Sequence, residues 1–363
     1  MMRSLVVNTV FMLIAGVTLA AGGTNPGEEI SGGPINVPSD GIIDGVYIQQ
    51  HIPTKRMIPY EYVREADAMW SRRVWEYIDL REKINHPLYY PHDEWNAAGY
   101  WIKNATRWSL WTVIKTHVMN GDLTIYSPFL PELSGLGGLD GDQLKYPIEP
   151  QPGLNFFTDS VFALTLKSTY LGTVIKDPNA QPLVDERPTL PDGSDNPAFG
   201  EPLIKVNPDG SQEYVYPPDE EVPFMSQDII QYKLKEDWFF DKERSVLDVR
   251  IIAIAPVVYN KQITAGPSGN TEQINGTRDL FWLYFPHCRF VFNNYFVYND
   301  KNDSQWMSFD DLFWKRKFNG VIYKATNTFD RQIESYRNGI DALYESEKIK
   351  DEIRLIEHDV WSF

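Results

Sequence analysis

The sequence contains a single cysteine, Cys288, among its 363 residues. One cysteine cannot form an internal disulfide, so packing rather than covalent cross-linking must stabilise the fold. A lipid-anchored envelope protein also needs a cysteine at its cleavage point, and no cysteine stands near the N-terminus. We therefore expect no lipid anchor attached directly to this chain.

Positive charge is scarce, because 34 Lys and Arg residues stand against 50 Asp and Glu residues and give a formal net charge of −16. Nucleic-acid binding depends mainly on Lys and Arg side chains that neutralise phosphates. The longest basic tract is Lys315-Arg316-Lys317, which is too short to hold an anionic lipid surface by charge alone. The composition therefore argues against nucleic acid as a partner and against direct docking on lipid.

Motifs of the common catalytic classes are missing. The sequence has no Gly-x-Ser-x-Gly nucleophile elbow and no glycine-rich phosphate-binding loop. His287 stands beside Cys288, but adjacent residues of a predicted strand point to opposite faces, so the two side chains do not meet. We interpret Cys288 as a buried structural residue, and we expect neither an enzyme nor a bound cofactor.

The six histidines are scattered along the chain. Only His86 and His92 are close, and they flank a proline-rich loop that continues into Asp93 and Glu94. Zinc can use such ligands, but their spacing matches none of the recognised helical or knuckle patterns. We favour a hydrogen-bonded structural loop over a metal site.

Long apolar runs are confined to the N-terminus, where Arg3 precedes a mostly apolar run at residues 5–19 and small residues follow. A charged start, an apolar middle and a small-residue exit are the layout of a cleavable secretion signal. The run is short for a bilayer span, which takes about 20 residues. We therefore predict a signal peptide at residues 1–21 rather than an uncleaved anchor, followed by a flexible N-terminus at residues 22–45.

Apolar periodicity predicts a mainly helical region at residues 46–126. Ala66, Trp70, Val74 and Ile78 recur every four residues, which predicts one apolar face of a helix.

A second helix is predicted at residues 108–119, with Gly121 suited to the position just past its end. The amino-acid composition changes after this helix: residues 127–227 are dense in Pro, Gly, Asp and Asn. These are turn-forming residues, and a stretch this long without regular elements is usually functional or ordered by a partner. We predict an irregular Pro/Gly-rich region there.

Residues 228–363 combine strands with helices. Two β-rich runs separated by a charged segment predict a hairpin, and two further runs extend the sheet, at residues 229–234, 246–254, 280–285 and 289–298. Ser308 followed by Asp311 resembles a helix capping box, and the last helix is predicted at residues 330–358. The predicted fold class is α+β: an antiparallel sheet flanked by N-terminal and C-terminal helices, with a long irregular Pro/Gly-rich middle region.

Aromatic residues are abundant, with 11 Trp, 20 Tyr and 19 Phe. The rings at 70, 75 and 77 cannot share one face of the predicted helix, so some of them must meet loops or another chain. Trp, Tyr and Arg are the residues that most often carry binding hot spots. The predicted interface therefore consists of Arg72, Arg73, Trp75, Trp238, Glu345 and Trp361.

Glu236 and Asp237 precede the aromatic run Trp238-Phe239-Phe240. Two carboxylates beside an aromatic platform are typical of sugar-cleaving sites. A charged turn beside a core anchor explains the same residues, and nothing in the sequence tunes either carboxylate for acid or base chemistry. A periplasmic glycan-binding or glycan-cleaving protein stays open as the alternative function.

Three groups of segments resemble the GldN/PorN family of the type IX secretion and gliding machinery. They lie at residues 44–47, 51–56, 64–67 and 79–88, then at 235–241 and 245–252, and finally at 345–350 and 357–361. The residues between about 133 and 223 carry little of the resemblance.

This resemblance implies a periplasmic, non-enzymatic ring component that lies beneath the outer membrane. It implies assembly with the lipoprotein GldK, repetition of the chain around the ring, and coupling to the motor proteins GldL and GldM. A lipoprotein partner would supply the anchor that this chain lacks.

Overall fold

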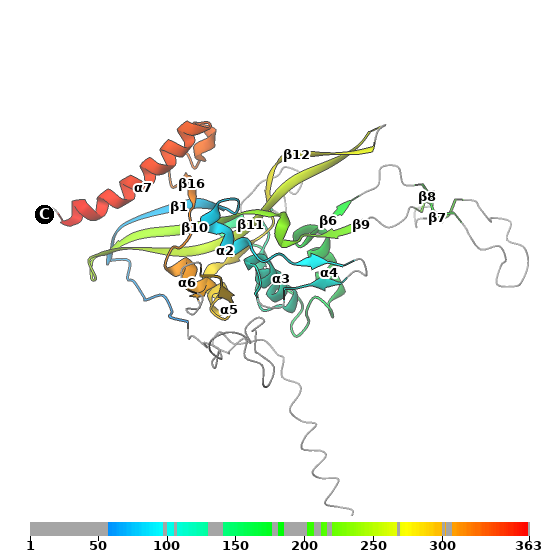
Figure 1. Ribbon diagram of the computed structural model, residues 1–363, viewed down its shortest axis with the longest axis horizontal. Coiled ribbons are helices and arrows are strands. Elements are labelled where there is room, and N and C mark those ends of the chain that lie inside the picture. Colours follow the sequence, from blue (N-terminus) through cyan, green and yellow to red (C-terminus); the bar gives the residue numbers. More distant parts are fainter. Residues whose placement is uncertain are drawn as a thin grey trace, which may run out of the picture. The chain divides into compact units, whose positions relative to one another are not determined.

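The computed structural model describes residues 57–96, 100–104, 107–129, 141–175, 181–184, 202–206, 212–215, 220–266, 269–299, 302 and 307–361. The predicted signal peptide and flexible N-terminus lie outside the described residues, as does much of the predicted irregular region, so these three stay predictions. The fold class is α+β, as predicted (Figure 1).

The described residues form two compact units. Unit 1 draws on Met1–Ala163, Met225–Val258 and Asp279–Phe363, and unit 2 draws on Leu164–Phe224 and Tyr259–Arg278. Unit 2 holds two small antiparallel pairs, β6 (Gly172–Ile175) with β9 (Glu220–Pro223) and β7 (Ile204–Val206) with β8 (Gln212–Tyr214). All side chains considered below belong to unit 1.

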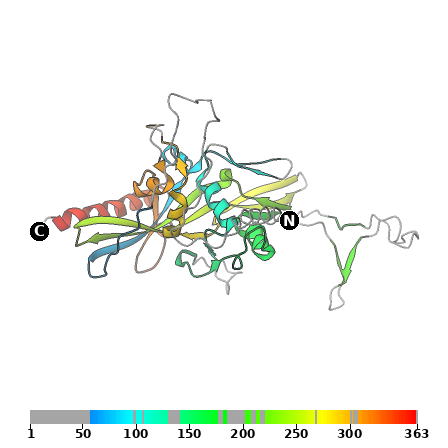
Figure 2. The same ribbon diagram turned by 90° about the horizontal axis from the view of Figure 1, so that it is seen from below.

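The main sheet has eight strands in the order β16-β1-β10-β11-β13-β4-β5, and β12 pairs with β11. Its longest strands lie side by side in both views (Figures 1 and 2). The strands are β1 (Ala68–Asp79), β4 (Ile125–Tyr126), β5 (Pro147–Ile148), β10 (Ile229–Asp241), β11 (Val246–Gly266), β12 (Gly269–Asp279), β13 (Trp282–Tyr284) and β16 (Val321–Ala325). Two small pairs join unit 1 outside this sheet: β2 (Glu94–Trp95) with β3 (Trp101–Ile102), and β14 (Phe296–Val297) with β15 (Met307–Ser308).

The helices are α2 (His86–Tyr89), α3 (Leu110–Asn120), α4 (Ser160–Thr165), α5 (Phe285–Phe292), α6 (Phe309–Trp314) and α7 (Ile340–Trp361). The prediction of α3 is confirmed, and Gly121 follows it in the left-handed conformation with φ 86°. Only glycine adopts that conformation without strain.

The helix predicted from the residues spaced four apart is wrong, because β1 occupies that position. Four is a multiple of two, so Trp70, Val74 and Ile78 also share one face of a strand. The aromatic and β-branched side chains in between favour a strand. β1 pairs with β10 on one side and β16 on the other, which places it inside the sheet. The described part of the region at 46–126 is therefore mixed rather than mainly helical.

The strand predicted at residues 289–298 is also wrong, because its first four residues belong to α5 and only β14 within it is extended. Pro286 stands in the first turn of α5, where a helix tolerates proline because that N–H has no helical partner. His287 and Cys288 are therefore successive helical residues. Cys288 is 1% exposed, which confirms that it is buried, and burial raises the pKa of its thiol far above the usual range.

The β10–β11 hairpin is confirmed and is longer than predicted, with its turn at residues 242–245. The last helix begins later than predicted, at Ile340, directly after Gly339 with φ 59°. Ile349 and Ile353 of α7 pack against Val74 of β1 and Ile322 of β16. α7 therefore lies on the sheet beside β16 (Figure 1).

The capping box of α6 is confirmed and gives a first prediction. Ser308 Oγ accepts a hydrogen bond of 3.1 Å from the Asp311 backbone, and Asp311 Oδ2 accepts one of 3.4 Å from the Ser308 backbone. We expect Ser308→Ala to lower the free energy of unfolding by about 1 kcal/mol, because an N–H of the first turn loses its acceptor. Urea unfolding measures the change. Ser335→Ala, at an exposed hydroxyl, is the control, and an equal loss in both variants would contradict the prediction.

Candidate interaction surface

One face of β1 and its neighbours carries aromatic rings beside cations. Alternate residues of a strand share a face, so Arg73, Trp75 and Tyr77 lie together. Their register partners on β10 are Asp237, Lys235 and Lys233. We call this surface the Trp75 face and define it by Arg73, Trp75, Tyr77, Lys233, Lys235, Asp237, Tyr323 and Lys324.

Trp75 is the fixed centre of this face. Its indole Nε1 donates a hydrogen bond of 3.0 Å to Asp142 Oδ2. The ammonium groups of Lys324 and Lys235 stand 4.6 and 5.8 Å from its ring, within the range of cation–π attraction. Lys235 also donates to the Asp142 carbonyl at 2.6 Å. Trp75 is only 7% exposed, so it supports the surface from within.

The accessible part of the Trp75 face is the ion pair of Arg73 with Asp237. Arg73 Nε and Nη2 donate to the two carboxylate oxygens at 2.5 and 2.7 Å. The hydrogen bond to Asp237 raises the pKa of Arg73. The Arg73 side chain keeps 43% of its surface exposed. A planar guanidinium held in this way is pre-organised for contact with another protein.

The opposite face of the same two strands holds a buried charge cluster, formed by Glu76, Glu236 and Arg316. Arg316 Nη2 donates to Glu76 at 2.9 Å, and Arg316 Nη1 donates to Glu236 at 2.7 Å. The carboxylates are 3% and 0% exposed. Gly320 closes over Glu76, because a Cβ at Gly320 would lie 2.8 Å from Glu76 Oε2. A larger residue at 320 would displace the Glu76 carboxyl group.

Two carboxylates share one guanidinium in this cluster, so the site holds one negative charge too many if both ionise. Burial raises the pKa of Glu76 to about 8, the charge of Glu236 adds to the rise, and Arg316 opposes it. Burial lowers the pKa of Arg316, but the charges of Glu236 and Glu76 outweigh burial and raise it. Glu76 therefore keeps its proton at neutral pH, which relieves the excess of negative charge in the cluster.

Trp238 completes this cluster. Its indole Nε1 donates to Glu236 Oε2 at 3.2 Å, and the guanidinium carbon of Arg316 stands 5.1 Å from its ring centroid. Glu236 and Asp237 therefore point to opposite sides of β10, one into the cluster and one toward Arg73. They cannot act together on a single glycosidic bond.

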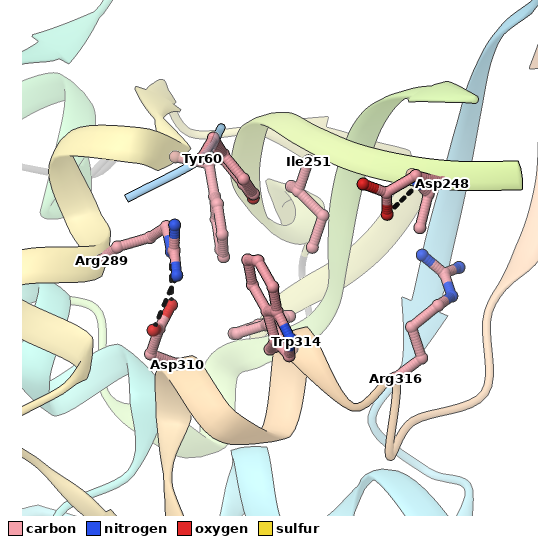
Figure 3. Close-up of a pocket in the computed structure, with 10 residues that line it drawn as sticks. Tyr60, Asp248, Ile251, Arg289, Asp310, Trp314 and Arg316 are labelled. Carbon is pink, nitrogen blue, oxygen red and sulfur yellow. Dashed lines mark hydrogen bonds and ion pairs between the residues drawn. The ribbon is translucent and has the colours of Figure 1, made fainter. Parts of the chain in front are cut away.

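Tyr60, from the segment that precedes β1, lines a small cavity beside the cluster (Figure 3). Arg289 donates to the carboxylate of Asp310 at 2.7 and 3.1 Å, and Tyr60 stacks on Trp314 with 5.7 Å between ring centroids. The guanidinium carbon of Arg289 is 4.5 Å from the Tyr60 ring. Burial raises the pKa of Tyr60 to about 12. The cavity holds about 110 Å³. The contacts of Tyr60 with Trp314 and Arg289 anchor the segment that leads into β1.

The structure separates the six predicted interface residues. Trp75 and Trp238 lie on opposite faces of the sheet, each bonded within the chain. Arg72 donates to Glu352 of α7 at 2.8 Å, so it holds the last helix in place. Arg73 is exposed on the Trp75 face, and Glu345 is half-buried on α7. Trp361 ends α7, and its side chain lies outside the described residues. The interface as a set stays a prediction.

Neither Glu76 nor Arg316 was among the predicted site residues. Glu76 alternates with Val74 and Ile78 along β1. If this segment is predicted as a strand, Glu76 falls on the buried face and needs a charged partner there. Arg316 belongs to the one basic tract noted in the sequence, but its two partners are 240 and 80 residues away.

The proline-rich histidine loop is structural in this fold. Asp93 is 3% exposed and accepts hydrogen bonds from the Ser226 backbone and from Trp101 Nε1, at 2.7 and 2.5 Å. His92 Nδ1 lies 3.3 Å from Ser226 Oγ. Across the described residues, no three His, Cys, Asp or Glu side chains gather as a group suited to a metal ion.

None of the described helices combines the length and the apolar character that a bilayer crossing requires.

Comparison with known proteins places these features in a family. The search of curated proteins returned no match. A family model described as gliding motility associated protein GldN matches residues 63–362. The match includes β1, β10, α6 and α7, and with them the Trp75 face and the buried charge cluster. The chain therefore belongs to the GldN family of gliding motility associated proteins.

Proposed function

We propose that the chain is a structural, non-enzymatic subunit of a periplasmic ring in type IX protein secretion and gliding motility. In this proposal it repeats around the ring, assembles with the lipoprotein GldK, and couples to the periplasmic part of GldM and so to the GldL/GldM motor. The single observation that carries the proposal is the family match over residues 63–362. GldK holds the chain at the inner face of the outer membrane.

The Trp75 face is the surface that we assign to GldK. It presents an Arg, two Tyr and a supporting Trp on a rigid sheet, and these residue types dominate binding hot spots. Arg73 is pre-organised by Asp237, so little side-chain entropy is lost when a partner binds. The geometry gives less support to a glycan-cleaving function, because the two candidate carboxylates point to opposite faces.

Co-purification with GldK tests the proposal. The mature chain is produced together with GldK, and the size and composition of the complex are measured by light scattering. We expect a complex that contains several copies of both proteins. Two proteins that stay separate at high concentration would overturn the proposed function.

Arg73→Ala tests the assigned surface. We expect GldK binding to weaken about tenfold or more, because truncation of a hot-spot side chain costs at least about 1.4 kcal/mol. The fold should hold, since an exposed ion pair contributes at most about 1 kcal/mol. Arg64→Ala is the matched control, because Arg64 also pairs with an Asp at 2.6 Å and is 66% exposed. Equal binding by the two variants would remove the Trp75 face from the GldK interface.

A further inference from the structure

A groove on unit 1 combines apolar walls with a positively charged rim. It holds about 730 Å³ and is lined by Lys83, Ile84, His86, Pro87, Tyr90, Arg107, Tyr298, Asn299, Met307, Leu312 and Lys317. Ile84, Tyr90 and Tyr298 are 54%, 49% and 49% exposed, so large apolar side chains face solvent here. We call it the Ile84 groove.

The charge of this groove is opposite to that of the chain. Lys83, Arg107 and Lys317 line it, and no Asp or Glu does among the described residues. None of these three cations makes an ion pair with another described residue. Arg107 stands over the Tyr298 ring at 5.0 Å. In a protein with a net charge of −16, the groove is suited to an occupant that is apolar and acidic.

The first two turns of α7 carry that chemistry. Ile340, Leu343 and Tyr344 are 70%, 48% and 71% exposed, on the side of the helix away from the buried Ile349 and Ile353. We call this surface, together with Asp341 and Glu345, the α7 face.

Asp341 and Glu345 are four residues apart, so they lie on one flank of the helix. Neither makes an ion pair with another described residue. The face is therefore an amphipathic helix surface with three exposed apolar side chains and an acidic flank that makes no ion pair within the described part of the chain.

We infer that the α7 face of one copy binds in the Ile84 groove of a second copy. The inference rests on the proposed function, which requires the chain to repeat. Three apolar side chains of α7 enter the groove, and the carboxylates of Asp341 and Glu345 meet the rim cations, as in other helix-in-groove complexes. Groove and helix are different surfaces, so the contact is heterologous and generates a ring when its rotation closes.

The α7 face does not occupy the Ile84 groove of its own chain. Arg72 holds Glu352 at 2.8 Å, and Lys350 Nζ donates to the Gly320 carbonyl at 2.6 Å. These contacts fix α7 on the sheet and leave Ile340, Leu343 and Tyr344 exposed. A second copy is the occupant that this arrangement fits.

Charge reversal on each side tests the contact. One variant carries Lys83→Glu and Lys317→Glu, and the other carries Asp341→Lys and Glu345→Lys. Self-association of the mature chain is measured by sedimentation velocity over a range of concentrations. We expect each variant alone to associate about tenfold more weakly than the wild type, and an equimolar mixture of the two to recover association because opposite charges meet again. A mixture as weak as its components overturns the inference.

Cysteine cross-linking identifies the surfaces directly. Cys288 is 1% exposed and stays unreactive. Any disulfide that forms therefore joins two introduced cysteines. We expect chains with Ile84→Cys mixed with chains with Leu343→Cys to form a disulfide-linked dimer under mild oxidation. The control replaces Leu343→Cys with Leu355→Cys, at an exposed α7 residue farther along the helix. Equal yields in both mixtures overturn the inference. If the chain still forms its complex with GldK in that case, the proposed function stands and only this contact is wrong.

Discussion

Replacement of Arg316 by methionine is expected to lower the free energy of unfolding by about 3 kcal/mol, which is a large part of the stability of a domain. Arg316 is the cation that contacts both Glu76 and Glu236. Without it, two carboxyl groups that are almost fully buried lose the cation that compensates for their desolvation. The Arg316 side chain itself is 29% exposed, so the loss falls at the lower end of the range for broken buried pairs.

Two controls separate loss of charge balance from loss of packing. Arg354→Met removes an exposed arginine that pairs with Asp351 at 2.9 Å, and it should cost less than about 1 kcal/mol. The triple variant Arg316→Met, Glu76→Gln and Glu236→Gln removes every charge of the cluster. We expect it to be more stable than Arg316→Met alone in urea unfolding. A triple variant that is as unstable as Arg316→Met would show that packing around the guanidinium, not charge balance, holds this site together.

The parts of the fold that the sequence predicts well are those set by local rules. Gly121 ends α3 because the position needs a left-handed backbone. Ser308 and Asp311 start α6 by satisfying two backbone N–H groups three residues apart. The β10–β11 hairpin is also local, since its strands are joined by a short charged turn. Each signal lies within a few residues of the structure that it specifies.

β1 shows where local rules fail. A spacing of four residues is common to one face of a helix and one face of a strand, so Val74 and Ile78 alone do not separate the two. The pairing of β1 with strands more than 150 residues away decides the matter, and composition between the spaced residues was the better guide. In α5, Pro286 was the missed signal, because it stands between the strands predicted at residues 280–285 and 289–298, where it suits the first turn of a helix.

The candidate site divides in the same way. Residue type pointed to Arg73 and Trp75, since these side chains are common at interfaces, and the structure places both on one face. Residue type could not place Trp238 on the opposite face, because that depends on the register between β1 and β10. The Glu76–Glu236–Arg316 cluster could not be predicted from the sequence, because its three residues come from segments far apart in the chain.

Glu76 should make the stability of the protein depend on pH between about 4.5 and 8. Burial raises the pKa of Glu76 from its ordinary value of 4.5 to about 8 in the folded chain. Within that window the folded state keeps the proton and the unfolded state has released it. Stability therefore falls as pH rises, by up to about 1.4 kcal/mol per pH unit, and levels off above pH 8. Below pH 4.5 both states are protonated and this contribution to stability is fully present.

The variant Glu76→Gln keeps the shape of the side chain and cannot ionise. We expect its stability advantage over the wild type to grow steadily from pH 4.5 to 8 in urea unfolding, whereas Glu347→Gln, at an exposed residue, should track the wild type throughout. The sign of the difference is the decisive result. If the wild type gains stability over Glu76→Gln as pH rises, Arg316 outweighs burial, and Glu76 is ionised in the folded protein. The cluster would then carry a net negative charge. Solvent contact at the exposed side of the Arg316 guanidinium would have to stabilise that charge inside the sheet.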